Sequence, residues 1–185
     1  MMSISTRKLR LRKLFPTFAD PDLWRDRGQK EKLDSDRWQR LRMMVLQRDD
    51  FTCQYCGYRS EKYQIIHHLD NNPKNNKLNN LATMCQMCNL IEHSGQGCVV
   101  KGVLDLYRES KYNQNDIIRT TREMRDQGKS DEEIANFLGL KHKMPFKMNK
   151  EYLKKLFGFV TSRSTRTGND MYDRWKAYHA QTKSR

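Results

Sequence analysis

The sequence predicts an α+β protein in which a small metal-bound core precedes a mainly α-helical C-terminal module. The core is indicated by two Cys-x-x-Cys pairs, Cys53 with Cys56 and Cys85 with Cys88, which 28 residues separate. A β-branched run at 63–68 lies between the pairs and predicts a short strand. In the last third of the chain, apolar residues recur at helical spacing. Hydrophobic residues make up 36% of the chain, so a metal is the expected means of holding so small a core.

The composition divides the chain into three predicted segments. Residues 1–34 form a basic arm and linker, residues 35–100 hold the metal-bound core, and residues 101–185 form the helical module. Lysine and arginine number 36 against 22 aspartate and glutamate residues, which gives a formal net charge of +14. This excess favours a polyanionic partner such as nucleic acid, although a membrane surface or an acidic protein also fits the charge alone.

The N-terminal arm alternates basic and apolar residues from Thr6 to Lys13. Such an arm can neutralise phosphates without reading sequence, and a solvated terminus with no specific role is the alternative. The acid-poor opening could also imitate an organelle transit peptide. No apolar run approaches the roughly 18 residues that span a bilayer, so we expect no membrane partner. Without an apolar signal-peptide core, the expected location is a reducing compartment such as the cytoplasm.

A helix is predicted to begin at Ser35 or Asp36, because either side chain can cap it and apolar residues such as Trp38 follow at helical spacing. This helix leads the chain into the first cysteine pair and is expected to be scaffold. Asp49 and Asp50 come directly after it. They are expected to end the helix and solvate the turn rather than to bind a metal.

The cysteine spacing predicts a structural zinc site. Each Cys-x-x-Cys turn directs both sulfurs to one point, so Cys53, Cys56, Cys85 and Cys88 can surround one tetrahedral Zn²⁺. Such a closed shell leaves no open position for catalysis. A disulfide framework is the alternative, but it belongs to small secreted domains, and nothing in the sequence suggests export. The remaining cysteine, Cys98, is expected to be a small buried apolar residue.

Residues with catalytic potential lie between and after the cysteine pairs. His67 and His68 end the predicted strand, Asn80 follows a loop, and Asn89 and His93 come after the second pair. This pattern resembles the HNH (ββα-metal) nuclease family. The resemblance implies that His67 binds a metal, that His68 is the general base, that Asn80 orients the base, and that Asn89 replaces the usual final histidine. His93 lies one helical turn after Asn89, so both side chains would face the same side of a helix. Some members of the family carry His-x-x-x-His at this place, so the resemblance implies that His93 is an additional ligand.

The resemblance implies a metal-dependent DNA endonuclease of homing or phage type, which nicks one strand of double-stranded DNA per active site. Mg²⁺ or another divalent ion bound by His67, Asn89 and His93 would polarise the scissile phosphate. His68, neutral near physiological pH, would take a proton from the attacking water. The alternative is that the histidines merely pack on the zinc site, but four competing thiolates favour a separate ion. A double-strand cut needs two sites, so monomer and homodimer both stay open.

The loop at 70–76 consists almost entirely of turn-forming residues. A DNA backbone could pass over it, with Lys74 and Lys77 available for phosphates. The stretch from Ser94 to Gly102 contains three glycines and is predicted to be a linker or turn.

Two helices are predicted beyond this linker. The first is capped by Asn115 or Asp116, and the second begins with a capping box formed by Ser130 and Glu133. Residues 128–140, which include the second of these helices, resemble helix-turn-helix segments of resolvase-like and sigma-like DNA-binding domains. Residues 141–148 delay the next helix, which departs from that pattern.

A third helix is predicted to start near Asn149 and to run to Val160 with its lysines outward. Basic residues in and after this helix are expected to contact DNA: Lys150, Lys154, Arg163 and Arg166. A plain helical scaffold is the alternative, because basic faces of small helices are often only solvated. A last helix from Asp170 carries Trp175 and other aromatics, whose helical spacing favours packing over stacking on bases.

Two non-catalytic interpretations stay open. The segment 75–88 also resembles the IcmJ (DotN) family, zinc-bearing adaptors of Dot/Icm-type secretion coupling complexes. An adaptor needs the fold and the cysteines but not the base, so the presence of both His67 and His68 favours the enzyme. The other interpretation is a zinc-ribbon-like nucleic-acid binder, which predicts salt-dependent binding without metal-dependent cutting.

Overall fold

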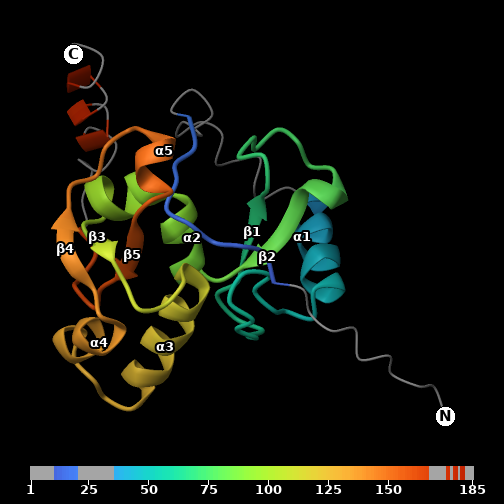
Figure 1. The fold of residues 1–185 in the computed structure, drawn as a ribbon. Helices are drawn as coiled ribbons and strands as arrows, with labels where there is room; N and C mark the ends of the chain where they lie inside the picture. Colours follow the sequence, from blue (N-terminus) through green and yellow to red (C-terminus); the bar gives the residue numbers. More distant parts are fainter. Residues whose placement is uncertain (1–10, 21–35, 167–173, 176, 179, 182–185) are drawn as a thin grey trace.

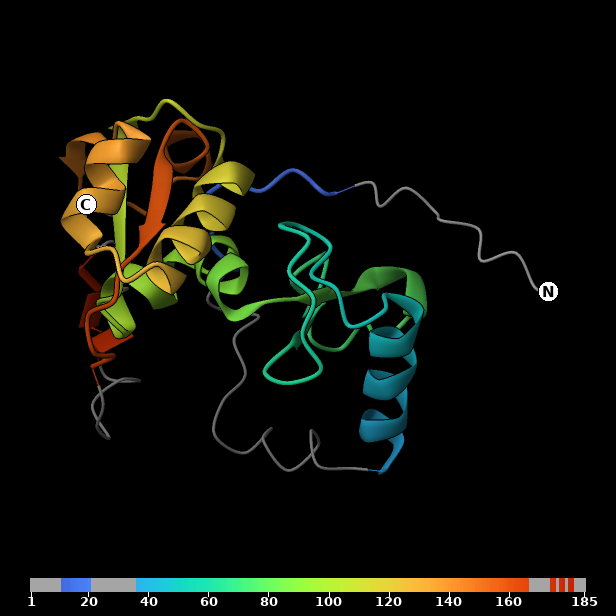
Figure 2. The same ribbon diagram turned by 90° about the horizontal axis from the view of Figure 1, so that it is seen from below.

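Figure 1 shows the fold of the computed structural model, which describes residues 11–20, 36–166, 174–175, 177–178 and 180–181. Helix and sheet are mixed along the chain, which confirms the predicted α+β class. One group of elements surrounds a two-stranded sheet and another surrounds a three-stranded sheet. Figure 2 shows α1 (Asp36–Arg48) of the first group at the opposite end of the molecule from the second group. No helix among the described residues is long and apolar enough to cross a membrane.

The first group consists of short elements that follow one another closely. In chain order they are α1 (Asp36–Arg48), β1 (Ile65–His68), a 3₁₀ turn (Leu78–Asn80), β2 (Leu81–Met84) and α2 (Gln86–Glu92). β1 and β2 are antiparallel, with His67 opposite Ala82 and His68 opposite Leu81. A small core joins Leu81 of this sheet to Val45 of α1. The two histidines therefore end a strand that is held between α1 and α2.

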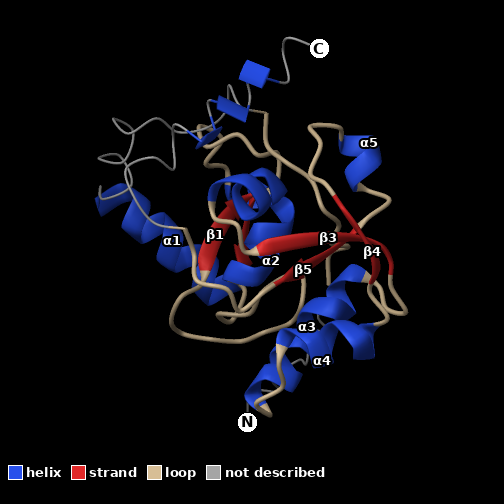
Figure 3. Cartoon of the chain, turned by 90° about the vertical axis from the view of Figure 1, so that its left-hand side faces the viewer, coloured by secondary structure: helices blue, strands red, loops and turns tan. Residues whose placement is uncertain are grey.

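The second group is built on a three-stranded antiparallel sheet with the order β4-β3-β5. Its elements are β3 (Leu104–Glu109), α3 (Gln114–Asp126), α4 (Asp131–Leu138), β4 (Lys141–Met144), α5 (Lys150–Leu153) and β5 (Phe157–Val160). α3 and α4 lie together beside the sheet (Figures 1 and 3). The region predicted to be mainly helical thus also contains three strands.

The predicted helix from Asn149 to Val160 is wrong after its first turn. Asn149 caps α5 as predicted, with its side chain accepting from the backbone N–H of Tyr152, but α5 ends at Leu153. The next residues form β5, because aromatic and β-branched side chains favour a strand that can pair with β3. Gly158 in β5 is required by packing, since a Cβ there would lie 2.6 Å from Cδ1 of Ile91 in α2.

The start of α3 also differs from the prediction. Its cap is Asn113 rather than Asn115 or Asp116, and Oδ1 of Asn113 accepts from the backbone N–H of Asp116 at 3.0 Å. The capping box of Ser130 and Glu133 at the start of α4 is confirmed. After α4 the chain enters β4 and only then α5, so the next helix of a helix-turn-helix does not follow α4 directly.

The predicted linker from Ser94 to Gly102 is a packed turn. Residues Gln96–Val100 form a single π-helical turn, and Gly97 and Val100 are buried. A Cβ on Gly97 would lie 2.8 Å from Cβ of Leu104, so a glycine lets this turn approach β3.

One hydrophobic core extends through both groups. It contains the four paired cysteines together with residues of α2, β3, α3 and β5. Residues 11–20 of the predicted arm join it through Leu14 and Phe18, and the backbone N–H of Arg12 donates to the carbonyl of Gln54 at 2.8 Å. The hydrophobic core therefore does not end at residue 100, and the division into separate folding units stays a prediction.

Two remaining predictions concern single side chains. Cys98 is half-buried and packs against the main core, and burial raises its pKa to about 12.

Asp170, the predicted start of the last helix, lies outside the described residues. Trp175 is helical and buried, and its ring stacks on Tyr178 with 6.1 Å between centroids. Trp175 therefore packs, as its spacing suggested.

Candidate metal centre and active site

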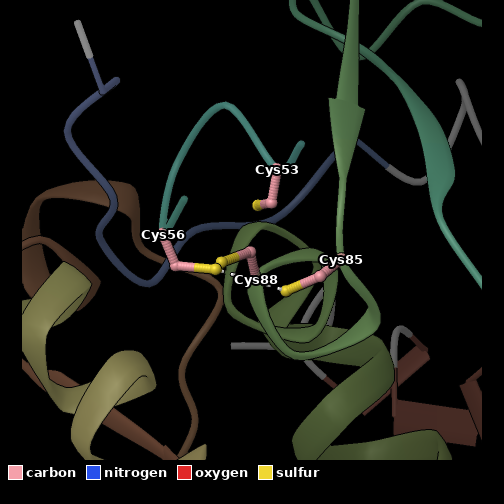
Figure 4. A group of neighbouring side chains, drawn as sticks. All are labelled: Cys53, Cys56, Cys85 and Cys88. Atoms are coloured by element: carbon pink, nitrogen blue, oxygen red, sulfur yellow. Dashed lines mark hydrogen bonds between the residues drawn. The ribbon is translucent and has the colours of Figure 1, made fainter. Parts of the chain in front are cut away.

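The four paired cysteines meet in one buried cluster (Figure 4). Cys53 and Cys56 lie on the loop before β1, Cys85 precedes α2 and Cys88 lies in its first turn. Their sulfur atoms all lie within 4.8 Å of one another, and those of Cys56 and Cys85 are 3.7 Å apart. Zn–S bonds of about 2.3 Å require tetrahedral S–S edges of about 3.8 Å, so the cluster fits a four-coordinate zinc ion.

Local backbone geometry produces this convergence. Gly57 has φ +80°, and its N–H donates to the carbonyl of Cys53 at 2.9 Å, which closes the first turn. Cys85 is the N-cap residue of α2, so Cys88 follows one turn later on the same side. Hydrogen bonds from its three neighbours lower the pKa of Cys53, and the hydrogen bond to Cys53 raises the pKa of Cys88. A bound metal ion would replace the protons of these thiols.

A second site lies beside the end of β1. A cavity of about 290 Å³ is lined by residues of β1, of the loop after it and of α2, among them His67, His68, Asn71, Asn89 and His93. The structure thus brings together the predicted base, His68, and all three predicted ligands of the catalytic ion. The centroids of the His67 and His93 rings are 5.4 Å apart.

The residues of this cavity suit a divalent ion. Burial lowers the pKa of His67 to about 3, with a further lowering from the charges of His93 and His68. Burial also lowers the pKa of His93 to about 4, so both imidazoles are neutral at pH 7 and can act as ligands. Oδ1 of Asn71 is buried and has no hydrogen-bond partner among the described residues, which adds an oxygen donor.

His68 is held by two residues that the sequence did not single out. Its Nε2 atom lies 2.9 Å from Oδ1 of Asn76 in the loop before β2. On its other side the ring of Trp38 in α1 stacks on it, with 5.8 Å between centroids and 8° between planes. Asn76 is one of several asparagines in this loop, so the sequence alone could not distinguish it. The helical spacing of Trp38 predicted only that Trp38 packs in a scaffold helix.

Asn80 stabilises the loop and does not contact His68 directly. Its Nδ2 donates to Oδ1 of Asp70 and to the carbonyl of Asn75, both at 2.9 Å. Its Oδ1 accepts from the backbone N–H of Asp70 at 3.1 Å. These bonds close the loop that carries Asn76, so Asn80 acts on His68 through the loop.

The predicted DNA contacts lie in three places. Lys74 and Lys77 are exposed on the loop between β1 and β2. Three of the others make ion pairs within the protein: Lys150 with Asp20 at 3.3 Å, Lys154 with Glu151 at 2.9 Å and Arg163 with Asp105 at 2.6 Å. Arg166 is exposed, and its backbone N–H donates to Lys101.

An antiparallel pair of strands followed by a helix, with two histidines ending the first strand, is the arrangement of a ββα-metal nuclease domain. Residues 53–95 match the model of the family described as HNH endonuclease, so the chain contains an HNH endonuclease domain at these positions. The chain is also similar to the Type 4 apparatus protein DotN of Legionella pneumophila strain Philadelphia 1. The two are 37% identical over 89 residues, which cover 46% of this chain and 41% of DotN.

Proposed function

We propose that the protein is a metal-dependent HNH endonuclease that nicks one strand of double-stranded DNA per active site. The observation that carries this proposal is the placement of His68 beside His67 and His93 in one cavity, with a hydrogen bond to Asn76. The net charge of +14 supports a polyanionic substrate. The clustered, unbridged thiols support a reducing compartment such as the cytoplasm.

The residues of the cavity have distinct roles in this proposal. His67, Asn89 and His93 would hold Mg²⁺ or another divalent ion, which would supply charge stabilisation for the scissile phosphate and the leaving oxygen. Nε2 of His68 donates to Asn76, which leaves Nδ1 as the basic nitrogen. His68 takes a proton from water as the water oxygen bonds to phosphorus, and the P–O3′ bond breaks. Zinc in the cysteine cluster stays structural, because its four thiolates leave no open position.

The similarity to DotN favours a second candidate function. The similarity covers 89 residues, so it extends beyond the HNH match at residues 53–95. In this alternative the protein is a non-catalytic, zinc-bearing component of a type 4 secretion apparatus. It retains the fold and the cysteine cluster but cuts no DNA.

A plasmid-nicking assay separates the two functions. Supercoiled plasmid is incubated with wild-type protein and with His68→Ala in Mg²⁺, Mn²⁺ or EDTA, after zinc content has been measured in both. His142→Ala is the matched control, since His142 is exposed on β4 and does not line the cavity. The endonuclease nicks with a divalent ion, and His68→Ala loses this activity while it keeps zinc. Wild-type protein that never cuts with any ion contradicts the enzyme and favours the apparatus component.

A further inference from the structure

One face of α3 is seated against the cysteine cluster. Asn115, Ile118 and Arg122 lie at i, i+3 and i+7, so they share this face. Nδ2 of Asn115 donates at 2.6 Å to the carbonyl of Tyr55, which lies between the two cysteines of the first pair. Ile118 is fully buried and belongs to the same core as all four cysteines. α3 therefore forms a wall of the metal centre along two helical turns.

Arg122 connects this wall to both halves of the cluster. Its Nη2 atom donates to Sγ of Cys85 at 3.4 Å. Its guanidinium carbon also lies 3.6 Å from the ring centroid of Tyr58, two residues after Cys56. The guanidinium thus lies over a residue that follows the first cysteine pair while it reaches a sulfur of the second pair.

The charge of the centre explains why an arginine suits this position. One Zn²⁺ with four thiolates has a net charge of −2, and such a buried charge requires nearby donors or cations. Among the described residues, Arg122 is the charged side chain that hydrogen-bonds to one of these sulfurs. Hydrogen bonds between ionised partners are roughly twice as strong as neutral ones.

We propose that Arg122 balances the charge of the zinc-bound cysteines, and that zinc binding and the seating of α3 are one coupled equilibrium. Coupling of this kind is reciprocal, so seated α3 slows zinc loss and bound zinc holds α3 in place. Arg122 lies outside residues 53–95, so the zinc centre of the HNH domain is completed by the C-terminal part of the chain. This coupling does not depend on DNA cleavage.

Zinc release from the full-length, zinc-loaded protein tests the role of Arg122. Release to the chromophoric chelator 4-(2-pyridylazo)resorcinol is followed for wild type, Arg122→Ala, Arg122→Lys and Arg122→Gln. We expect release from Arg122→Ala to be about 10- to 100-fold faster, as for other outer partners of metal ligands. Arg119→Ala is the matched control on the same helix, because Arg119 pairs with Asp116 and not with a cysteine, and its release should equal wild type. Unchanged release from Arg122→Ala overturns the proposal.

Two further readouts keep the test decisive. If Arg122→Ala does not fold, zinc release is compared between Arg122→Lys and Arg122→Gln. The lysine keeps the positive charge, whereas the glutamine keeps a hydrogen-bond donor without charge. Equal zinc release from these two variants contradicts charge balance.

Hydrogen exchange tests the coupling between zinc binding and α3. In the wild type, amides of Gln114–Asp126 should lose protection when zinc is removed, and in a folded Arg122 variant they should be less protected even with zinc. Protection that does not respond to zinc overturns the coupling.

Discussion

Nε2 of His68 lies 2.9 Å from Oδ1 of Asn76, and this contact joins the end of β1 to the loop before β2. An amide oxygen only accepts hydrogen bonds, so the contact places the ring proton on Nε2. The remaining nitrogen, Nδ1, then has the lone pair that a general base needs. In the proposed endonuclease, Asn76 therefore selects the tautomer of His68.

Substitution of Asn76 by alanine tests this role. Asn76→Ala should lower the nicking rate at saturating DNA by about tenfold or more, because the ring loses its fixed tautomer and orientation. The variant should change KM little, and its pH–rate profile should differ from that of the wild type. Asn79→Ala is the control, since Asn79 is exposed in the same region. Equal rates for wild type and Asn76→Ala would contradict a positioning role.

Asn80 should affect stability more than Asn76 does. Asn80→Ala removes three hydrogen bonds to Asp70 and Asn75 and should lower the free energy of unfolding by about 1–3 kcal/mol. Asn76→Ala removes one side-chain contact and should cost less. Urea unfolding of both zinc-loaded variants measures the difference. A larger loss for Asn76→Ala would show that Asn80 is not the main support of the loop.

The sequence predicted the features of the fold and of the site that depend on local spacing. The cysteine cluster follows from two Cys-x-x-Cys turns, and the capping box at Ser130 follows from side chains three residues apart. The roles of Asn76 and Trp38 depend on contacts between distant segments, which spacing does not encode. Among several asparagines of one loop, the fold decides which one reaches the imidazole.

The difference between local spacing and contacts of distant segments also explains why the sequence did not predict β5. β5 begins only a few residues after α5, and its apolar residues also fit a helical repeat, so periodicity alone could not separate the two. Pairing with β3 and the close approach of Ile91 to Gly158 determine the outcome. Arg122 is a similar case, because its partner Cys85 lies in another part of the chain.

Loss of one cluster cysteine should remove zinc and destabilise the whole chain. Cys88 is fully buried in the core that both groups share, so Cys88→Ser should abolish the single bound zinc and lower Tm strongly. Cys98→Ala is the control, because Cys98 lies outside the cluster and should keep one zinc per chain. Zinc stoichiometry and thermal unfolding provide both readouts. Full zinc content in Cys88→Ser would exclude the four-cysteine site.

Asp131 should make stability depend on pH in the acid range. Burial raises the pKa of Asp131, but hydrogen bonds from Ser162 and Arg125 lower it more, so the net pKa lies below its usual range. The stabilisation is therefore complete above the unfolded pKa of about 3.9 and is lost as pH falls through the folded pKa. The difference in Tm between wild type and Asp131→Asn should be constant from about pH 5 to 7 and shrink in acid. A difference in Tm that grows as the pH falls would contradict this assignment.

The cavity beside β1 should lose affinity for its divalent ion when His93 is removed. The His93 ring is neutral at pH 7 and lies 5.4 Å from the ring of His67, so it can share an ion with His67. In His93→Ala, Mn²⁺ binding measured by electron paramagnetic resonance should weaken by about tenfold or more, and nicking should require correspondingly more Mn²⁺. Gln96→Ala is the control, since Gln96 lines the same cavity without an imidazole. Because zinc content should stay constant in both variants, a change in Mn²⁺ binding reports on this cavity alone. Unchanged binding in His93→Ala would leave His67 and Asn89 as the ligands.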